Sequence, residues 1–158
     1  MNKIEGWMGE EELDFLHKIA KKMNSVVEIG SYQGRSTVAL LESGTKVTAI
    51  DTWKGNKELV VKKKDYKEFL KNIAKYSNLT IIVGESVKTS KQFDKVDMVF
   101  IDGDHTYKGV KRDIKAWLHK TTKLICGHDY DFEEVQRAVD EFFKVDGVIG
   151  SIWYKKLR

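Results

Sequence analysis

Short apolar runs rich in β-branched residues alternate along the chain with longer amphipathic segments. The longer segments carry apolar residues at helical spacing and predict helices over residues 10–23, 34–42, 58–76, 107–119 and 132–144, with a short helix or loop at 87–93. The apolar runs predict strands over residues 25–30, 46–51, 79–83, 96–102 and 123–126, and one bent strand or a hairpin about Gly150 over 148–157. Strands that alternate with helices are typical of parallel sheets joined by right-handed crossovers. The sequence therefore predicts a three-layer α/β/α sandwich around a doubly wound, mostly parallel sheet.

Composition indicates one globular domain in the cytoplasm. The chain has 158 residues, of which 41% are hydrophobic, and it shows no internal repeat or linker. No apolar run approaches the roughly 18 residues that a membrane span needs, and the segment that starts at Met1 lacks the basic start and apolar stretch of a secretory signal. Cys126 is the single cysteine, so no intramolecular disulfide is expected. We therefore expect a cytoplasmic protein without a membrane partner.

Positive charge is concentrated between Lys54 and Lys75, a segment that contains eight lysines and only three acidic residues. A basic stretch of this kind can mark a nucleic-acid site. However, only four of the 28 Lys and Arg residues are Arg, whereas phosphate-binding surfaces favour the forked guanidinium group. We interpret the lysines as a solvated surface and do not expect a nucleic-acid partner.

Polar residues gather where the predicted strands end, which is the edge at which doubly wound sheets bind ligands. The sequences at these ends are Glu28-Ile-Gly30-Ser-Tyr-Gln-Gly34, Asp51, Gly84-Glu85-Ser86, Asp102-Gly-Asp104-His105 and Gly127-His128-Asp129-Tyr130. Carboxylates at one edge repel each other unless a ligand or a cation is present. This arrangement therefore predicts a binding site rather than a feature that only stabilises the fold.

The first loop has the pattern Gly-x-x-x-Gly, between Gly30 and Gly34, and not the Gly-x-Gly-x-x-Gly of dinucleotide-binding proteins. Gly30 allows a tight turn, and Gly34 would let a ligand approach the backbone at the start of a helix. Asp51 ends the next strand, where a carboxylate can accept hydrogen bonds from both hydroxyls of a ribose. The ordered combination indicates a nucleoside-containing ligand.

Two groups of motifs resemble a known superfamily. Glu28-x-Gly30-x-x-x-Gly34-Arg-Ser36, followed by Asp51, resembles the first two motifs of class I S-adenosylmethionine-dependent methyltransferases. Ile101-Asp102-Gly-Asp104-His105-x-Tyr107, followed by Gly127-His128-Asp129-Tyr130, is similar to the small methyltransferase domain family 24 subgroup. The resemblance covers nearly the whole chain. It implies a Rossmann-like, seven-stranded sheet whose last strand is antiparallel, within one domain at 1–158 that has an N-terminal helical segment (1–24) and a core (25–158).

The resemblance also implies which residues bind S-adenosylmethionine. Gly30, Ser31 and Gly34 would face the methionine portion, and Glu28 would position their loop. Asp51 would bind the ribose, and Asp102 would lie at the cofactor as well as at the acceptor. The adenine would lie between Thr52 and Trp53 on one side and Glu85 and Ser86 on the other. For Trp53 the alternative is an aromatic side chain of the hydrophobic core.

Asp102 is the residue that we expect to carry substrate-side chemistry. A hydroxyl acceptor must lose a proton, either to a general base or under the influence of a metal ion. His105 or His128 could serve as the base, because imidazole titrates near neutral pH. In metal-dependent relatives the matching positions, here Asp102, His128 and Asp129, hold a divalent cation. A histidine ligand departs from the Asp-Asn pair of catechol-type enzymes and would favour a transition metal over Mg²⁺.

The expected function is methyl transfer from S-adenosylmethionine to a small molecule, at a hydroxyl oxygen. One alternative is a binding-only domain for S-adenosylmethionine or a nucleotide, and the motifs at five strand ends argue against this loss of catalysis. Another is a nicotinamide-dependent oxidoreductase, which is disfavoured because the third glycine is missing and no Tyr-x-x-x-Lys proton relay is expected. So short a chain has little room for a substrate-binding insertion, so a homodimer or a partner would supply selectivity.

Overall fold

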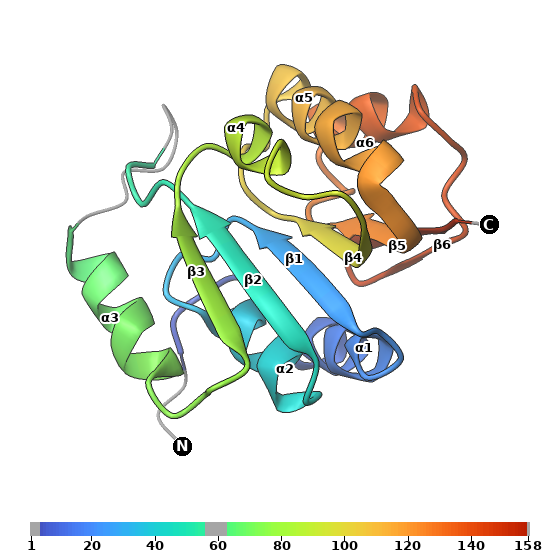
Figure 1. Cartoon of the computed structure of the whole chain (residues 1–158). Helices are drawn as coiled ribbons and strands as arrows, with labels where there is room; N and C mark the ends of the chain where they lie inside the picture. Colours follow the sequence, from blue (N-terminus) through green and yellow to red (C-terminus); the bar gives the residue numbers. More distant parts are fainter. Residues whose placement is uncertain (1–3, 56–62, 158) are drawn as a thin grey trace.

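The computed structural model describes residues 4–55 and 63–157, and these contain one seven-stranded sheet (Figure 1). The strands are β1 (Ser25–Ile29), β2 (Lys46–Asp51), β3 (Leu79–Val83), β4 (Val96–Ile101), β5 (Thr121–Gly127), β6 (Gly147–Ile149) and β7 (Ile152–Lys156). They lie in the order β3-β2-β1-β4-β5-β7-β6. The pairs from β3 to β5 are parallel, and β7 is antiparallel to both β5 and β6. The predicted mostly parallel sheet with an antiparallel last strand is confirmed.

Helices cover both faces of the sheet. They are α1 (Glu10–Ala20), α2 (Arg35–Glu42), α3 (Lys63–Ile73), α4 (Ser86–Ser90), α5 (Tyr107–Trp117) and α6 (Glu133–Asp140), with a 3-10 turn at Leu118–Lys120. In Figure 1, α1, α2 and α3 lie on one face, and α4, α5 and α6 lie on the other. The predicted three-layer sandwich is therefore present.

Alternating side chains of the central strands supply two separate cores. Val26 and Phe100 point to the face where they pack with Leu16 of α1 and Leu40 of α2. On the opposite face, Val27, Ile125 and their neighbours pack with Ile114 of α5 and Val139 of α6. Because both faces of the parallel strands are buried, these strands read as continuous apolar runs in the sequence.

Most element boundaries differ from the predicted ones by a few residues. Helix α3 was predicted over 58–76, of which residues 58–62 lie outside the described part. The helix ends at Ile73, and the N–H of Tyr76 donates to the Ile73 carbonyl in a turn that follows it. Helix α6 ends at Asp140 rather than at 144. The segment at 148–157 is a hairpin, with Gly150 at φ +59° in its turn. At the end of α3, a turn hydrogen bond replaces the next helical one, whereas the periodicity of the side chains alone predicts a longer helix.

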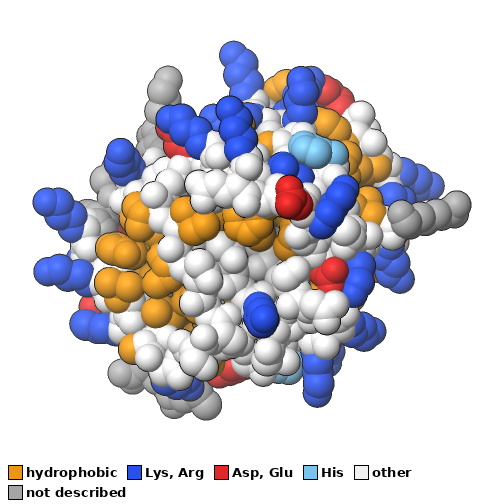
Figure 2. Space-filling view, in the orientation of Figure 1, with side chains coloured by type: hydrophobic (Ala, Val, Ile, Leu, Met, Phe, Trp, Pro, Cys, Tyr) orange, Lys and Arg blue, Asp and Glu red, His pale blue; other side chains and the backbone are white. Residues whose placement is uncertain are grey.

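The surface carries many basic side chains and a group of exposed hydrophobic ones (Figure 2). On the face drawn in Figure 2, Lys and Arg side chains are spread around the outline, and hydrophobic side chains gather beside the edge strand β3, where Val83 is exposed. Within residues 4–55 and 63–157, no helix is long and apolar enough to cross a membrane.

Candidate active site

A cavity of about 700 Å³ lies beyond the carboxyl ends of the parallel strands. Its lining comes from the loops after β1, β2, β3, β4 and β5 and from the N-terminal segment at residues 5–8. Small-molecule and cofactor sites commonly have volumes of roughly 300–1,000 Å³. The cavity therefore has the place and the size of a ligand site.

The loop between β1 and α2 passes very close to the end of β4. A Cβ atom at Gly30 would lie 2.1 Å from the carbonyl oxygen of Asp102, and Gly30 has φ +85°. Only glycine fits both the close approach and this backbone conformation. The Asp102 N–H also donates to the Ile29 carbonyl at 2.7 Å, which ties the two strand ends together. Gly30 thus brings the loop against the residue from which substrate-side chemistry is expected.

Glu28 holds this loop from beneath the sheet edge. Its buried carboxylate accepts hydrogen bonds from the hydroxyls of Ser31 (2.7 Å), Ser36 (2.6 Å) and Thr37. Burial raises the pKa of Glu28 to about 7, although the three hydroxyl donors oppose the shift. Glu28 itself does not line the cavity, and it acts on the loop through Ser31 and the start of α2.

Asp51 lines the cavity at the end of β2 and binds the same loop. One carboxylate oxygen accepts from the backbone N–H groups of Ser31 (2.9 Å) and Tyr32 (3.1 Å), and the other accepts from the N–H of Trp53 (2.7 Å). Tyr32 and Trp53 both have positive φ angles, of 47° and 48°. Asp51 therefore stabilises two strained backbone positions as well as facing the cavity.

Two residues expected at the cofactor lie elsewhere. Trp53 is 8% exposed, packs against Tyr66 and Phe69, and donates its indole N–H to the Tyr32 carbonyl at 2.8 Å. The core alternative considered for Trp53 is the one that the structure shows, because the indole lies under the loop and outside the cavity lining. Gly34 also lies outside the lining. It caps the start of α2, directly before Arg35, with φ +91°, and a Cβ there would lie 3.1 Å from the Phe69 ring. It makes room for α3 rather than for a ligand.

Thr52, Glu85 and Ser86 line the cavity on the side of β2 and β3, as expected. The exposed Glu85 carboxylate pairs with Lys88 at 2.9 Å. Ser86 accepts a hydrogen bond from the indole N–H of Trp117 at 2.8 Å, which fixes the start of α4 against α5. Behind Ser86, burial raises the pKa of Asp113 to about 6.

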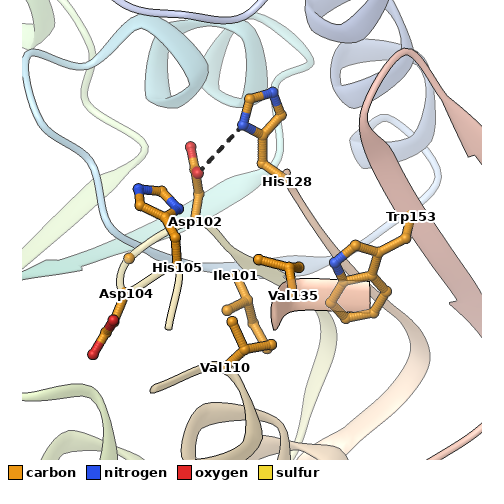
Figure 3. Close-up of a pocket in the computed structure, with 9 residues that line it drawn as sticks. Ile101, Asp102, Asp104, His105, Val110, His128, Val135 and Trp153 are labelled. Atoms are coloured by element: carbon orange, nitrogen blue, oxygen red, sulfur yellow. Dashed lines mark ion pairs between the residues drawn. The ribbon is translucent and has the colours of Figure 1, made fainter. Parts of the chain in front are cut away.

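Two histidines and two carboxylates meet at the ends of β4 and β5. His128 Nδ1 lies 3.1 Å from Asp129 Oδ1 and 3.6 Å from Asp102 Oδ1, and His105 Nδ1 lies 2.7 Å from Asp129 Oδ2. Figure 3 shows Asp102, His105 and His128 grouped together, with Asp104 turned away from them. The predicted convergence of Asp102, Asp129 and a histidine is confirmed.

The close contacts between these groups shift their protonation in opposite directions. Burial alone would lower the pKa of His128, but the hydrogen bonds to Asp102 and Asp129 raise it to about 11. The hydrogen bond to Asp129 raises the pKa of His105. Burial raises the pKa of Asp102, whereas the two histidines, against the effect of burial, hold the pKa of Asp129 well below its usual range. In the absence of a metal ion, the two carboxylates therefore favour the protonated form of His128.

The same group has donor atoms suited to a metal ion. Asp102, His128 and Asp129 each offer one ligand atom, and these atoms lie within 4.8 Å of one another. One imidazole nitrogen with two carboxylate oxygens suits a divalent transition metal better than Mg²⁺, which prefers oxygen alone. The residues present therefore fit such an ion.

A Tyr-x-x-x-Lys pair does occur, so the expectation that there is none is wrong. Lys111 Nζ donates to the Tyr107 hydroxyl at 2.9 Å on the outer surface of α5. Both side chains also contact Glu141 of the neighbouring segment. Neither residue lines the cavity, so the two side chains form a surface hydrogen bond beside the Lys111–Glu141 ion pair and do not favour a nicotinamide-dependent reaction.

Several residues of the site were not predicted. Trp7 is 67% exposed, lines the cavity and packs against Tyr32 with ring centroids 5.1 Å apart. Across the cluster, Phe132 is 50% exposed and contacts His105 edge to face at 6.1 Å. Glu12 lies behind His128, with Oε1 3.3 Å from Nε2. No sequence signal pointed to the individual side chains of Trp7, Phe132 or Glu12.

Comparison with known proteins agrees with this geometry. A family model described as a methyltransferase domain matches residues 27–130. The matched segment includes the loops after β1, β2, β3 and β4 in full, and the start of the loop after β5. The chain therefore belongs to this methyltransferase family. No curated protein sequence is significantly similar to it.

Solved structures share the fold at low sequence identity. An O-methyltransferase from Bacillus cereus in complex with S-adenosylhomocysteine has a TM-score of 0.73 and 15% identity, over 99% of this chain and 85% of that one. A putative caffeoyl-CoA O-methyltransferase from Staphylococcus aureus also has a TM-score of 0.73 at 15% identity, over 97% and 86%. A methyltransferase from Podospora anserina with bound S-adenosylhomocysteine has a TM-score of 0.70 at 14% identity, over 96% and 80%.

Proposed function

We propose that the protein transfers the methyl group of S-adenosylmethionine to a hydroxyl oxygen of a small-molecule acceptor. The observation that carries this proposal is one cavity with two chemically different ends. One end has the Gly30 loop and Asp51, and the other has the cluster of Asp102, His105, His128 and Asp129. Membership in a methyltransferase family supports it, as do the S-adenosylhomocysteine complexes of two structures with the same fold.

The cofactor would bind along the ends of β1, β2 and β3. Gly30 and Ser31 would contact its methionine portion, and Thr52, Glu85 and Ser86 would surround its adenine. Asp51 would bind the ribose hydroxyls, using lone pairs that the three backbone donors leave free. Glu28 would act indirectly by holding Ser31.

The acceptor would bind at the other end, with His105 as its general base. Because Nδ1 of His105 is held by Asp129, its Nε2 is the nitrogen left to take the acceptor proton. The acceptor oxygen would then attack the methyl carbon in line, the carbon–sulfur bond would break, and its electron pair would stay on sulfur to give S-adenosylhomocysteine. Asp102 would orient the acceptor hydroxyl, and the His128 cation would balance the charge of Asp102 and Asp129.

A divalent transition metal held by Asp102, His128 and Asp129 is a second way to activate the hydroxyl. When bound, such an ion would lower the pKa of the acceptor hydroxyl. The arrangement of donor atoms supports this alternative. A rise in melting temperature on addition of Mn²⁺ or Co²⁺, but not of Mg²⁺, would favour it, because an ion that binds only the folded state stabilises that state.

Replacement of Asp102 by Asn tests the proposed reaction. We expect Asp102→Asn to lose methyl transfer by about 100-fold or more, the scale that misplacement of a reacting group can cost, while it keeps most of its affinity for S-adenosylhomocysteine. Transfer would be measured with radiolabelled S-adenosylmethionine and a panel of phenolic, catecholic and sugar hydroxyls. His17→Gln, on α1 and outside the cavity lining, is the control. Full activity in Asp102→Asn would contradict the proposal, and cofactor binding without transfer to any acceptor would favour a binding-only domain.

A further inference from the structure

The carboxylate of Glu12 connects three parts of the chain behind the acceptor end of the cavity. Glu12 belongs to α1, which precedes the segment matched by the family model, and its residue is 8% exposed. Its Oε1 accepts from the backbone N–H of Ser151 (2.8 Å) and from the Ser151 hydroxyl (2.9 Å), and it lies 3.3 Å from His128 Nε2. Glu12 does not line the cavity, so it reaches the site only through His128.

The two oxygens of this carboxylate have separate partners. Oε2 accepts from the Gly9 N–H at 2.8 Å, which satisfies a free donor at the start of α1. A helix cap needs only this oxygen, and Oε1 is turned toward the β6–β7 turn and His128. A Cβ at Gly150 would lie 2.6 Å from the Glu12 side chain, so the turn closes tightly over the carboxylate. Glu12 is therefore held in place from α1 and from the hairpin.

The position of Glu12 determines which edge of the His128 ring faces the cavity. With Nε2 beside Glu12, Nδ1 points to Asp129 at 3.1 Å and to Asp102 at 3.6 Å. A rotation of the ring by half a turn would place carbon atoms at these contacts. The carboxylates of Glu12, Asp102 and Asp129 would then lose the nitrogen atoms of His128 as partners. A second carboxylate on the far nitrogen is a common way to fix the orientation and tautomer of a functional histidine.

We propose that Glu12 is a positioning residue of the methyl-transfer site, which acts by holding the His128 ring with Nδ1 between Asp102 and Asp129. The inference rests on the proposed function. It applies whether Nδ1 donates to the two carboxylates or binds a metal ion, because Glu12 contacts the opposite nitrogen in both cases. The catalytic cluster then depends on a helix and a hairpin turn that lie outside the loops at the strand ends.

The test combines nitrogen NMR of the histidine rings with steady-state kinetics. The chain has four histidines, and His128→Gln assigns the His128 signals by their loss. In Glu12→Gln we expect a changed His128 Nε2 signal and at least a tenfold lower kcat, with KM for S-adenosylmethionine within twofold of the wild-type value. Glu11→Gln makes the same chemical change on the exposed side of the same helical turn and is the matched control. Ser151→Ala removes one donor to Glu12 but leaves its contact with His128. Both control variants are expected to keep the wild-type His128 signals.

Each outcome of this test has a definite meaning. If Glu12→Gln lowers only the melting temperature and leaves the His128 signals and kcat unchanged, Glu12 only caps α1 and stabilises the β6–β7 hairpin, and the proposal is overturned. If Glu12→Gln does not fold, Glu12→Asp keeps the charge on a shorter side chain that cannot span both contacts, and unchanged His128 signals in that variant would overturn the proposal equally. If the wild-type protein fails to bind S-adenosylhomocysteine, the proposed function fails, but the His128 signals still report whether Glu12 orients the ring.

Discussion

His105 Nδ1 lies 2.7 Å from Asp129 Oδ2, and this contact joins the loops that follow β4 and β5. It leaves Nε2 as the nitrogen of His105 that can accept a proton, in the manner of a carboxylate–imidazole pair. Asp129 has a φ angle of 59°, which is uncommon for a residue other than glycine. A backbone position of this kind persists where surrounding contacts hold it, and it is often found at functional sites.

His105 and Asp129 should therefore act as a unit. We expect His105→Gln to lower methyl transfer by about 100-fold or more, and Asp129→Asn to lower it by a similar factor, because both remove the oriented base. The double variant should be little worse than either single one, since contacting residues show non-additive effects. Turnover rates of the four proteins, measured at saturating S-adenosylmethionine, give this comparison. Additive losses would show that the two side chains work independently.

Asp51 should contribute to cofactor affinity and to the order of its loop. Asp51→Ala removes the acceptor of three backbone N–H groups and of the proposed ribose hydroxyls. The loss of a hydrogen-bonded charged acceptor costs about 1–3 kcal/mol, or roughly 5- to 150-fold in affinity. Calorimetric titration with S-adenosylhomocysteine measures the effect, and Asp14→Ala on the exposed side of α1 is a control. An unchanged affinity in Asp51→Ala would remove this residue from the cofactor site.

Glu28 should make the protein less stable as the pH rises. Its pKa is about 7 in the folded state, against an ordinary value of 4.5, because the carboxylate is buried. A group whose pKa is raised by folding stabilises the protein fully below its unfolded pKa, and this contribution is lost as the pH rises through the folded pKa. The expected loss between about pH 4.5 and 7.5 is on the order of 1–3 kcal/mol.

Glu28→Gln should flatten this pH dependence, because the amide does not titrate and can still accept hydrogen bonds from the serine hydroxyls. Urea unfolding at several pH values gives the free energy of unfolding for both proteins. The decisive quantity is the difference between the two pH slopes. Identical slopes would show that Glu28 does not titrate in this range in the folded protein.

Trp7 and Phe132 should affect the acceptor and not the cofactor. Both are large, exposed side chains that line the cavity, where Trp7 packs on Tyr32 and Phe132 packs on His105. Trp7→Ala and Phe132→Ala should raise KM for the acceptor severalfold and leave the affinity for S-adenosylhomocysteine unchanged. The free energy of unfolding should change by about 1 kcal/mol or less, as is usual for exposed positions. Val148→Ala, exposed and outside the cavity lining, is the control; equal KM values in all three variants would place the acceptor elsewhere.

Sequence periodicity and glycine spacing were sufficient to predict the layers, the parallel strands and the edge that carries the site. Asp51, Asp102 and His128 were found because each lies at or just beyond the carboxyl end of a strand, and parallel strands bring these ends to one edge. The antiparallel last strand came from the family resemblance and not from periodicity, which gives no strand direction.

Positions that depend on packing between distant segments were not predictable. The indole of Trp53 packs in the core against Tyr66 and Phe69 of α3. Gly34 lies so close to Phe69 that a larger residue would crowd the same helix. Ser151, the partner of Glu12, lies 139 residues away in sequence. The hydrogen bond from the Gly9 N–H is local and explains only one oxygen of that carboxylate.

The most direct test of the proposed function is calorimetric titration of the wild-type protein with S-adenosylhomocysteine and, separately, with NAD. The geometry of the Gly30 loop and Asp51 predicts that S-adenosylhomocysteine binds with a stoichiometry of one per chain and that NAD does not bind. Binding of NAD, or no binding of S-adenosylhomocysteine in the presence or absence of Mn²⁺, would contradict the account.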